Sequence, residues 1–146
     1  PQLICRAGFT LLQNEAARVV ISGQNVDILG LSTMKYATPA TAKRRFPLRG
    51  ERPGAAFRLG LVHEPAAVQL LPEGWAGFIL AGHTHAGQLH VPQLERLWLP
   101  KGSGPYAHGL YQTPAGPLYV SAGLGESGPR MRFCAPREAA VFNIRP

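Results

Sequence analysis

The sequence predicts an α/β fold built from short strands and a few short helices. Its 146 residues are 45% hydrophobic, which suits one domain with an ordinary core. The 17 glycines and 14 prolines divide the chain into short elements joined by many turns. A strand, a short helix and a second strand follow one another over residues 57–81. Such a unit places its two strands side by side and parallel through a right-handed crossover.

The first elements are a hairpin and a short helix. Two runs rich in β-branched residues, 19–21 and 26–31, flank the polar turn 22–25. Residues 38–45 predict a short helix, because Thr38 can cap its start and Pro39 fits its first turn.

The crossover is predicted from residues 57–62, 64–71 and 77–81. The middle segment has Pro65 near its start, as short helices often do, and the outer segments are apolar runs. Parallel neighbours carry their C-terminal ends on one edge of the sheet, where ligands bind in open α/β folds.

The remaining chain predicts strands joined by loops. A short strand is expected at 88–91 and a glycine- and proline-rich loop at 98–106. Strands 109–112 and 118–121 are expected to pair, and a last strand is expected at 138–144.

The formal net charge is +7, with the densest basic cluster between residues 43 and 52. A solvated basic face is the favoured interpretation, and attraction of an anionic partner is the alternative. No basic motif interleaved with aromatic residues gives a specific nucleic-acid signal.

The cysteines and the hydropathy bear on location. Cys5 and Cys134 lack the spacing of a zinc ribbon or redox pair, and we expect both to be reduced and buried, with one disulfide as the alternative. No apolar run approaches the ~20 residues that cross a bilayer. We therefore expect a cytoplasmic protein, or one held at the membrane periphery by an upstream segment.

Three of the five histidines stand at the ends of the two crossover strands. His63 follows the strand 57–62, whereas His83 and His85 follow the strand 77–81. Alternate side chains of an extended backbone share a face, so His83 and His85 can converge on one centre. Together with His63 they predict a metal site. Asp27, the one aspartate of the chain, lies inside an apolar strand and cannot complete a carboxylate-rich site.

Other candidate residues are weaker. His90 and His108 are expected on the surface or in loops, although His108 could reach a loop that lines the site. The glycines of 123–128 match a dinucleotide-binding pattern, but Pro129 follows and no helix opens, so we expect a turn. The loop 98–106, with Lys101, is the best candidate for contributing to specificity.

Several segments carry a family resemblance: Leu-Val-His-Glu-Pro at 61–65, Ile-Leu-Ala-Gly-His-Thr-His-Ala-Gly-Gln-Leu at 79–89, and the segments 109–111, 119–125 and 136–138. In order and spacing they resemble the C-terminal half of a calcineurin-like metallophosphoesterase, in the bacterial branch whose signature is Gly-His-Thr-His-Gly-Gly-Gln. Ala86 stands where that branch usually has glycine. The resemblance implies that residues 1–146 form a domain or half-domain, the C-terminal part of a β-sandwich flanked by short helices.

The resemblance also implies a chemistry. His63 and His83 would ligate one divalent metal ion and His85 a second, with manganese, iron or zinc as the metals. A metal-activated water would hydrolyse a phosphomonoester or phosphodiester, in a small-molecule or lipid substrate.

The resemblance leaves part of the family pattern unmatched. The Asp-x-His, Gly-Asp and Asn-His elements are absent from this sequence, so its catalytic and substrate-binding residues are unknown. We therefore expect the chain to lack the N-terminal ligands and to need a missing N-terminal half or a second chain.

Two other functions fit the same residues. The three histidines could hold a single zinc ion with water in the fourth position, as in a mononuclear hydrolase. Alternatively, the chain is a non-catalytic half-domain that docks on a partner, or forms a homodimer, through an uncovered sheet face.

Overall fold

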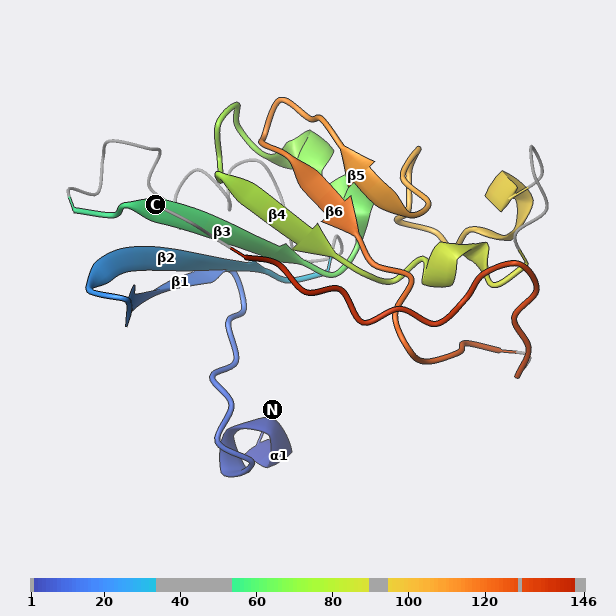
Figure 1. The fold of residues 1–146 in the computed structure, drawn as a ribbon, viewed down its shortest axis with the longest axis horizontal. Helices are drawn as coiled ribbons and strands as arrows, with labels where there is room; N and C mark the ends of the chain where they lie inside the picture. The colour runs from blue at the N-terminus through green and yellow to red at the C-terminus, as the bar shows by residue number, and fades with distance from the viewer. Residues whose placement is uncertain (1, 34–53, 90–94, 129, 144–146) are drawn as a thin grey trace.

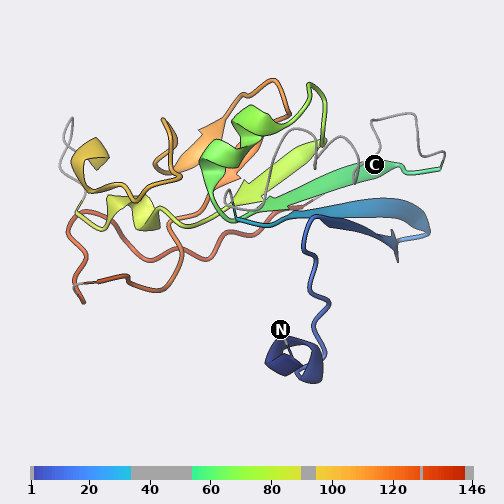
Figure 2. The same ribbon diagram turned by 180° about the vertical axis from the view of Figure 1, so that it is seen from behind.

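In a computed structural model, residues 2–33, 54–89, 95–128 and 130–143 are described, and they form one mixed six-stranded sheet with a few short helices (Figures 1 and 2). The strand order is β1-β2-β3-β4-β6-β5. This is the α/β arrangement that the sequence predicts. The elements are α1 (Gln2–Arg6), β1 (Glu15–Ile21), β2 (Gln24–Leu31), β3 (Phe57–Val62), η1 (Pro65–Leu70), β4 (Phe78–Ala81), η2 (His85–Gly87), η3 (Glu95–Trp98), β5 (Gly109–Tyr111) and β6 (Leu118–Val120).

Strands β1 and β2 form the predicted hairpin. Their turn is shorter than expected, because Gln24 and Asn25 pair within the ladder and only Ser22 and Gly23 connect the strands. Both connecting residues have positive φ, +49° and +77°, as a two-residue turn that matches the twist of its strands requires.

The centre of the sheet is parallel. Strand β3 lies between β2 and β4, both parallel to it, and β4 is parallel to β6. The short helix between β3 and β4 is confirmed as the 3₁₀ helix η1. The predicted crossover is therefore present, and it brings the C-terminal ends of β3 and β4 together.

The hydrophobic core lies on the face covered by η1 and by the loops around Trp75 and Ala115. Trp75 is fully buried and stacks over Gly60 of β3. A Cβ atom at Gly60 would lie 2.4 Å from the indole, so this glycine makes room for the largest core side chain. The core cluster consists of Leu29, Leu31, Val62, Ala67, Val68, Leu71, Trp75, Ala76, Ile79, Ala81, Ala115, Leu118 and Val120.

The opposite face of the sheet is less covered. Phe142 packs on Phe78 and Tyr119, with ring centroids 5.2 and 4.9 Å apart. Leu61 on β3 remains 37% exposed. Figures 1 and 2 show α1 standing apart from the sheet at the end of an extended segment.

Within the described residues, the strands predicted at 88–91 and 138–144 are not formed. Residues 138–143 are irregular, because Glu138 turns its carboxylate toward Tyr119 and the backbone of Ala122 instead of entering a ladder. The strand expected at 88–91 is reduced, within the described residues, to a single bridge between Leu89 and Phe133.

The cysteine prediction was wrong in one respect. Cys5 and Cys134 are both free thiols, but both are exposed rather than buried. Cys5 lies on α1, away from the core, and Cys134 has a positive φ of +51° in a surface loop.

The predicted helix 38–45, the basic cluster and His90 lie outside the described residues. Within the described part of the chain, no helix has both the length and the apolar character needed to cross a membrane.

Candidate metal centre

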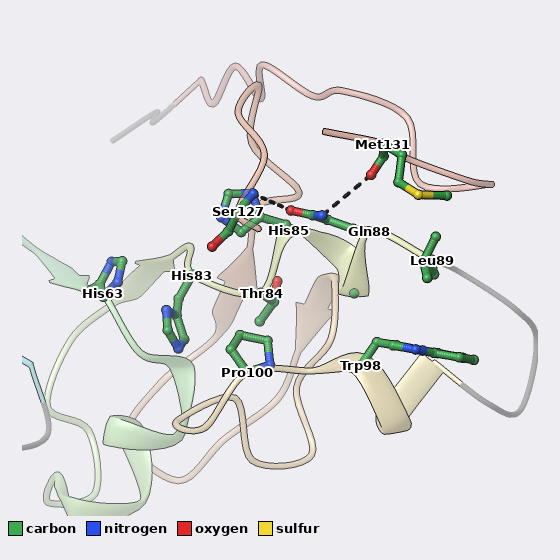
Figure 3. A pocket seen from close by; sticks show the side chains of 11 residues that line it. His63, His83, Thr84, His85, Gln88, Leu89, Trp98, Pro100, Ser127 and Met131 are labelled. Carbon is green, nitrogen blue, oxygen red and sulfur yellow. Dashed lines mark hydrogen bonds between the residues drawn. The ribbon is translucent and has the colours of Figure 1, made fainter. Parts of the chain in front are cut away.

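The three candidate histidines meet at one rim of the sheet. His63 directly follows β3, whereas His83 and His85 follow β4, and all three line one pocket of about 380 Å³ (Figure 3). The Gly82 amide donates a hydrogen bond to the His63 carbonyl over 3.3 Å, which ties the two strand ends together. The predicted convergence of the strand ends is therefore confirmed.

His63 and His83 form the closest pair. Their ring centroids are 4.7 Å apart and their planes meet at 60°. Partial burial lowers the pKa of His63, and the neighbouring positive charges of protonated His83 and His85 lower it further, while Glu64 opposes the shift. The lowered pKa favours the neutral imidazole, which is the form that binds a metal ion.

This environment predicts that His63 titrates below the value of about 6.5 that an unperturbed histidine shows. NMR titration of its Cε1–H signal measures this pKa directly. Replacing His83 by alanine should raise the pKa, because a like charge is removed. A His63 pKa at or above 6.5 in the metal-free chain would contradict the described pairing.

The backbone between β4 and η2 is strained. His83 has φ +72°, and the Thr84 amide bonds to the Gly82 carbonyl over 2.8 Å, which is a γ-turn of the rare positive-φ kind. His85 and Ala86 also have positive φ, +51° and +52°. Such conformations cost non-glycine residues about 1–3 kcal/mol each and cluster at functional sites.

Two variants of one residue test this strain. His83→Gly and His83→Ala both remove the imidazole, but only glycine tolerates the left-handed conformation without a Cβ clash. Chemical denaturation should show His83→Gly to be more stable than His83→Ala by about 1 kcal/mol. Equal stabilities, or a more stable alanine variant, would mean that His83 is not held at positive φ in solution.

Ala86 stands at a position where the Gly-His-Thr-His-Gly-Gly-Gln signature has glycine. Its positive φ of +52° is a backbone conformation that favours glycine. Its methyl group is 5% exposed and packs with Ala122 and Ala135. This contact offsets part of the backbone cost and explains why alanine is compatible with the site.

Backbone carbonyls orient two of the rings. His83 Nε2 lies 2.7 Å from the Lys101 carbonyl, and His85 Nδ1 lies 3.2 Å from the Gly125 carbonyl. If each of these nitrogens carries the proton and donates it, Nδ1 of His83 and Nε2 of His85 remain as the lone-pair nitrogens. A carbonyl partner on the second ring nitrogen is the usual support of a metal-binding histidine.

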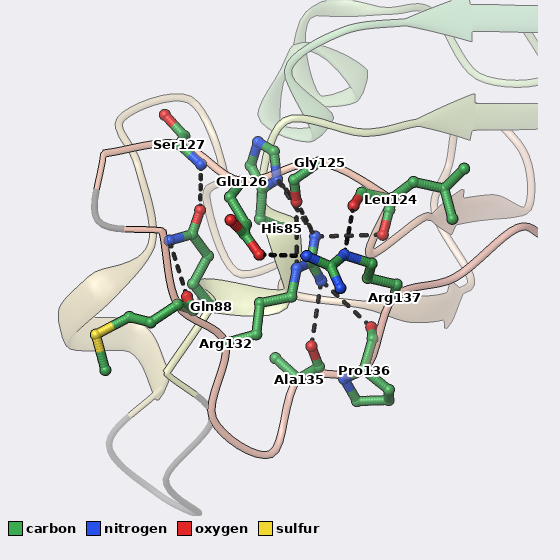
Figure 4. A network of polar contacts seen from close by, with 12 residues as sticks. His85, Gln88, Leu124, Gly125, Glu126, Ser127, Arg132, Ala135, Pro136 and Arg137 are labelled. Atoms are coloured by element: carbon green, nitrogen blue, oxygen red, sulfur yellow. Dashed lines mark hydrogen bonds and ion pairs between the residues drawn. The ribbon is translucent and has the colours of Figure 1, made fainter.

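Arg132 organises the loop behind His85 (Figure 4). Its guanidinium donates hydrogen bonds to five backbone carbonyls, those of Ala122, Gly123, Gly125, Ala135 and Pro136. One of its nitrogens lies 3.5 Å from His85 Nδ1. Nothing in the sequence distinguishes Arg132 from the other scattered arginines, because its role depends on carbonyls that the folded loop brings together.

Residues 123–128 form a loop, as predicted, and side chains hold it in place. Arg137 forms an ion pair with Glu126 over 2.6 Å and donates to the Leu124 carbonyl. The Ser127 amide donates to the Gln88 side chain. Ser127 of this loop lines the histidine pocket.

The remaining candidates lie elsewhere. Asp27 is fully buried in β2 and is bonded through both oxygens to Arg18, so it is removed from the rim as expected. His108 is exposed and pairs with Glu138 over 3.0 Å. The acidic partner was not anticipated, because Glu138 was expected in a strand.

Imidazole nitrogens suit zinc and other borderline divalent metals, so the donor chemistry fits a metal ion. The three histidines by themselves do not form a complete metal site. Among the described residues, no three His, Cys, Asp or Glu side chains are grouped as a metal ion requires. The described arrangement gives a close His63–His83 pair, and His85 lines the same pocket.

Known proteins resemble most of the chain. A metallophosphoesterase of Bacillus subtilis, YkuE, is 29% identical over 98% of this chain. A metallophosphoesterase of Campylobacter jejuni is 32% identical over 82% of it, and a phosphodiesterase of Escherichia coli, YaeI, is 25% identical over 82%. The chain is therefore related to the metallophosphoesterases over most of its length.

The chain matches only part of each relative. The aligned regions are 49% of the Bacillus subtilis protein, 30% of the Campylobacter jejuni protein and 42% of the Escherichia coli protein. The chain thus spans about half the length, or less, of the curated relatives that it matches, which is consistent with the predicted half-domain. No protein-family model matches the chain, and no solved structure matches it significantly.

Proposed function

We propose that this chain supplies His63, His83 and His85 to a divalent-metal centre that hydrolyses phosphoesters. The observation that carries the proposal is the convergence of the three imidazoles in one pocket at the ends of two parallel strands. The relationship to the metallophosphoesterases supports the reaction class.

The chain's own residues prepare such a centre. The lowered pKa of His63 keeps its imidazole neutral near pH 7, and the Lys101 and Gly125 carbonyls fix the rings of His83 and His85. When bound, the metal ions supply an activated water and neutralise phosphate charge. The pocket then has to orient the phosphoester and limit access of bulk water.

We further propose two ions in the complete site, with His63 and His83 on one and His85 on the other. The division rests on the close His63–His83 pair and on the separate support of His85 by the Gly125 loop. Manganese, iron or zinc suits imidazole donors. A single zinc held by all three histidines would need them to be grouped more tightly than in the described arrangement.

The remaining ligands are proposed to come from the part of the relatives' length that this chain does not match. The sheet face with the exposed Leu61 is the proposed docking surface, since its apolar side chains are less covered than those of the opposite face. The substrate is proposed to be a phosphorylated small molecule or lipid.

Metal analysis and hydrolysis assays test this function. The chain should be expressed alone and together with the part of the Bacillus subtilis relative that it does not match, and each preparation should be assayed with bis(4-nitrophenyl) phosphate and zinc or manganese. The proposal expects metal-dependent hydrolysis in the combined preparation and lower activity in the chain alone. A combined preparation that binds metal at full occupancy without hydrolysing any phosphoester would favour the non-catalytic half-domain.

A further inference from the structure

The histidine pocket has two ends of different chemistry. His63 and His83 lie at one end, and Leu89, Trp98 and Met131 lie at the other (Figure 3). Trp98 is 43% exposed and Met131 is 51% exposed, so much of the indole and of the thioether side chain is open to solvent. An exposed apolar surface that continues a polar site is typical of a ligand-binding cleft.

The apolar end is assembled from three separate segments that backbone contacts hold in position. The Gln88 carbonyl accepts the Phe133 amide over 2.7 Å, and the Gln88 side-chain amide reaches the Met131 carbonyl over 3.5 Å. Trp98 ends η3 and is followed at once by the loop that contributes Pro100 and the Lys101 carbonyl contact to His83. A short segment of chain, from Trp98 to Lys101, therefore connects the Trp98 indole with the carbonyl that contacts the His83 imidazole.

The Gln88 side chain, which lines the pocket beside the apolar end, is already engaged. The Gln88 side chain accepts the Ser127 amide through its oxygen and donates through its nitrogen to Met131. A ligand group that binds by hydrogen bonds would therefore have to displace the bonds of Gln88, whereas an apolar group would remove open indole and thioether surface from water without doing so.

We propose that the apolar end binds an apolar group, alkyl or aryl, that the phosphoester substrate carries next to its phosphate. The inference rests on the proposed function for the phosphate end and adds the substrate class. The pocket volume of about 380 Å³ is at the lower end of the range of small-molecule sites. A volume of this size fits a compact ligand rather than a large one.

Tryptophan fluorescence tests the proposal without requiring turnover. The chain holds two tryptophans, of which Trp75 is fully buried, and the variant Trp75→Phe leaves Trp98 as the only emitter. This protein would be titrated with methyl, hexyl and phenyl phosphate, each with and without zinc. Burial of a hexyl or phenyl group in place of a methyl should lower the half-saturating concentration by at least about tenfold.

Two further variants separate the pocket from its surroundings. Trp98→Ala should abolish the preference for hexyl and phenyl phosphate over methyl phosphate. Because this variant lacks the fluorescent side chain, NMR of the Met131 methyl group measures the binding instead. Leu97→Ala is the matched control, since Leu97 is an equally apolar neighbour that is 73% exposed and does not line the pocket. The control should keep the full preference.

The outcomes are distinct. A preference for phenyl phosphate alone supports an aryl substituent, and a preference for hexyl phosphate alone supports an alkyl chain. Methyl phosphate binding as tightly as both, or no apolar phosphate binding at all, overturns the inference. Zinc binding to the histidines, followed by their Cε1–H signals, reports separately on the proposed function and is expected to be unaffected by Trp98→Ala.

Discussion

Replacing His83 by alanine in the complete site is expected to reduce phosphoester hydrolysis by about a hundred- to a thousandfold. A metal ion contributes several kcal/mol of charge stabilisation, and each 1.36 kcal/mol corresponds to a factor of about ten in rate. His83 contacts His63 and is fixed by the Lys101 carbonyl, so its loss removes both a ligand and the partner of the closest pair. Rate measurements over a range of metal concentrations check the prediction.

His108→Ala is the matched control. His108 is exposed and bonded to Glu138, and it does not line the histidine pocket. Hydrolysis should stay within a few-fold of the unmodified protein. If both variants lost activity equally, a general effect of histidine removal on folding would explain the loss better than a metal site.

Replacing Gly116 by alanine is expected to destabilise the fold by about 3–5 kcal/mol, the sum of a backbone strain and an overpacking cost. Gly116 has φ +136°, and a Cβ atom there would lie 2.2 Å from the carbonyl oxygen of Ala76. That contact is with backbone, and the loops that meet there cover the core. Urea denaturation measures the change in unfolding free energy, which is a large share of the stability of a typical domain.

Gly123→Ala is the control for the clash. Gly123 also has positive φ, +65°, but a Cβ atom there would meet nothing within 4 Å. This variant should lose only about 1 kcal/mol, the conformational cost of a left-handed alanine. Equal losses for the two variants would show that the close approach to Ala76 does not exist in solution.

The parts of the fold that follow from local pattern could be predicted. The hairpin, the crossover and the β5–β6 pair each depend on an apolar run bounded by turn residues. The strand expected at 138–144 is not formed over the described residues 138–143: Phe142 packs on Phe78 and Tyr119 from outside the ladder, and Val141 is 94% exposed. Alternation alone does not reveal whether a segment pairs its backbone or only its side chains.

The candidate site could be predicted only in part. The strand-end positions of His63, His83 and His85 predicted their common rim, because parallel neighbours share an edge. The extended backbone expected from His83 to His85 is not formed, since both residues have positive φ and β4 ends at Ala81. Arg132, the support of the Gly125 loop, could not be found, since its role depends on carbonyls that folding brings together. The apolar end of the pocket was equally hidden, because Leu89, Trp98 and Met131 come from separate segments.

Anomalous diffraction from crystals of the complete site grown with zinc or manganese tests the central claim most directly. We predict two metal peaks at the rim of the sheet, one within bonding distance of His63 and His83 and the other within bonding distance of His85. Metal peaks that none of the three histidines contacts, in a protein that hydrolyses phosphoesters, would contradict the account.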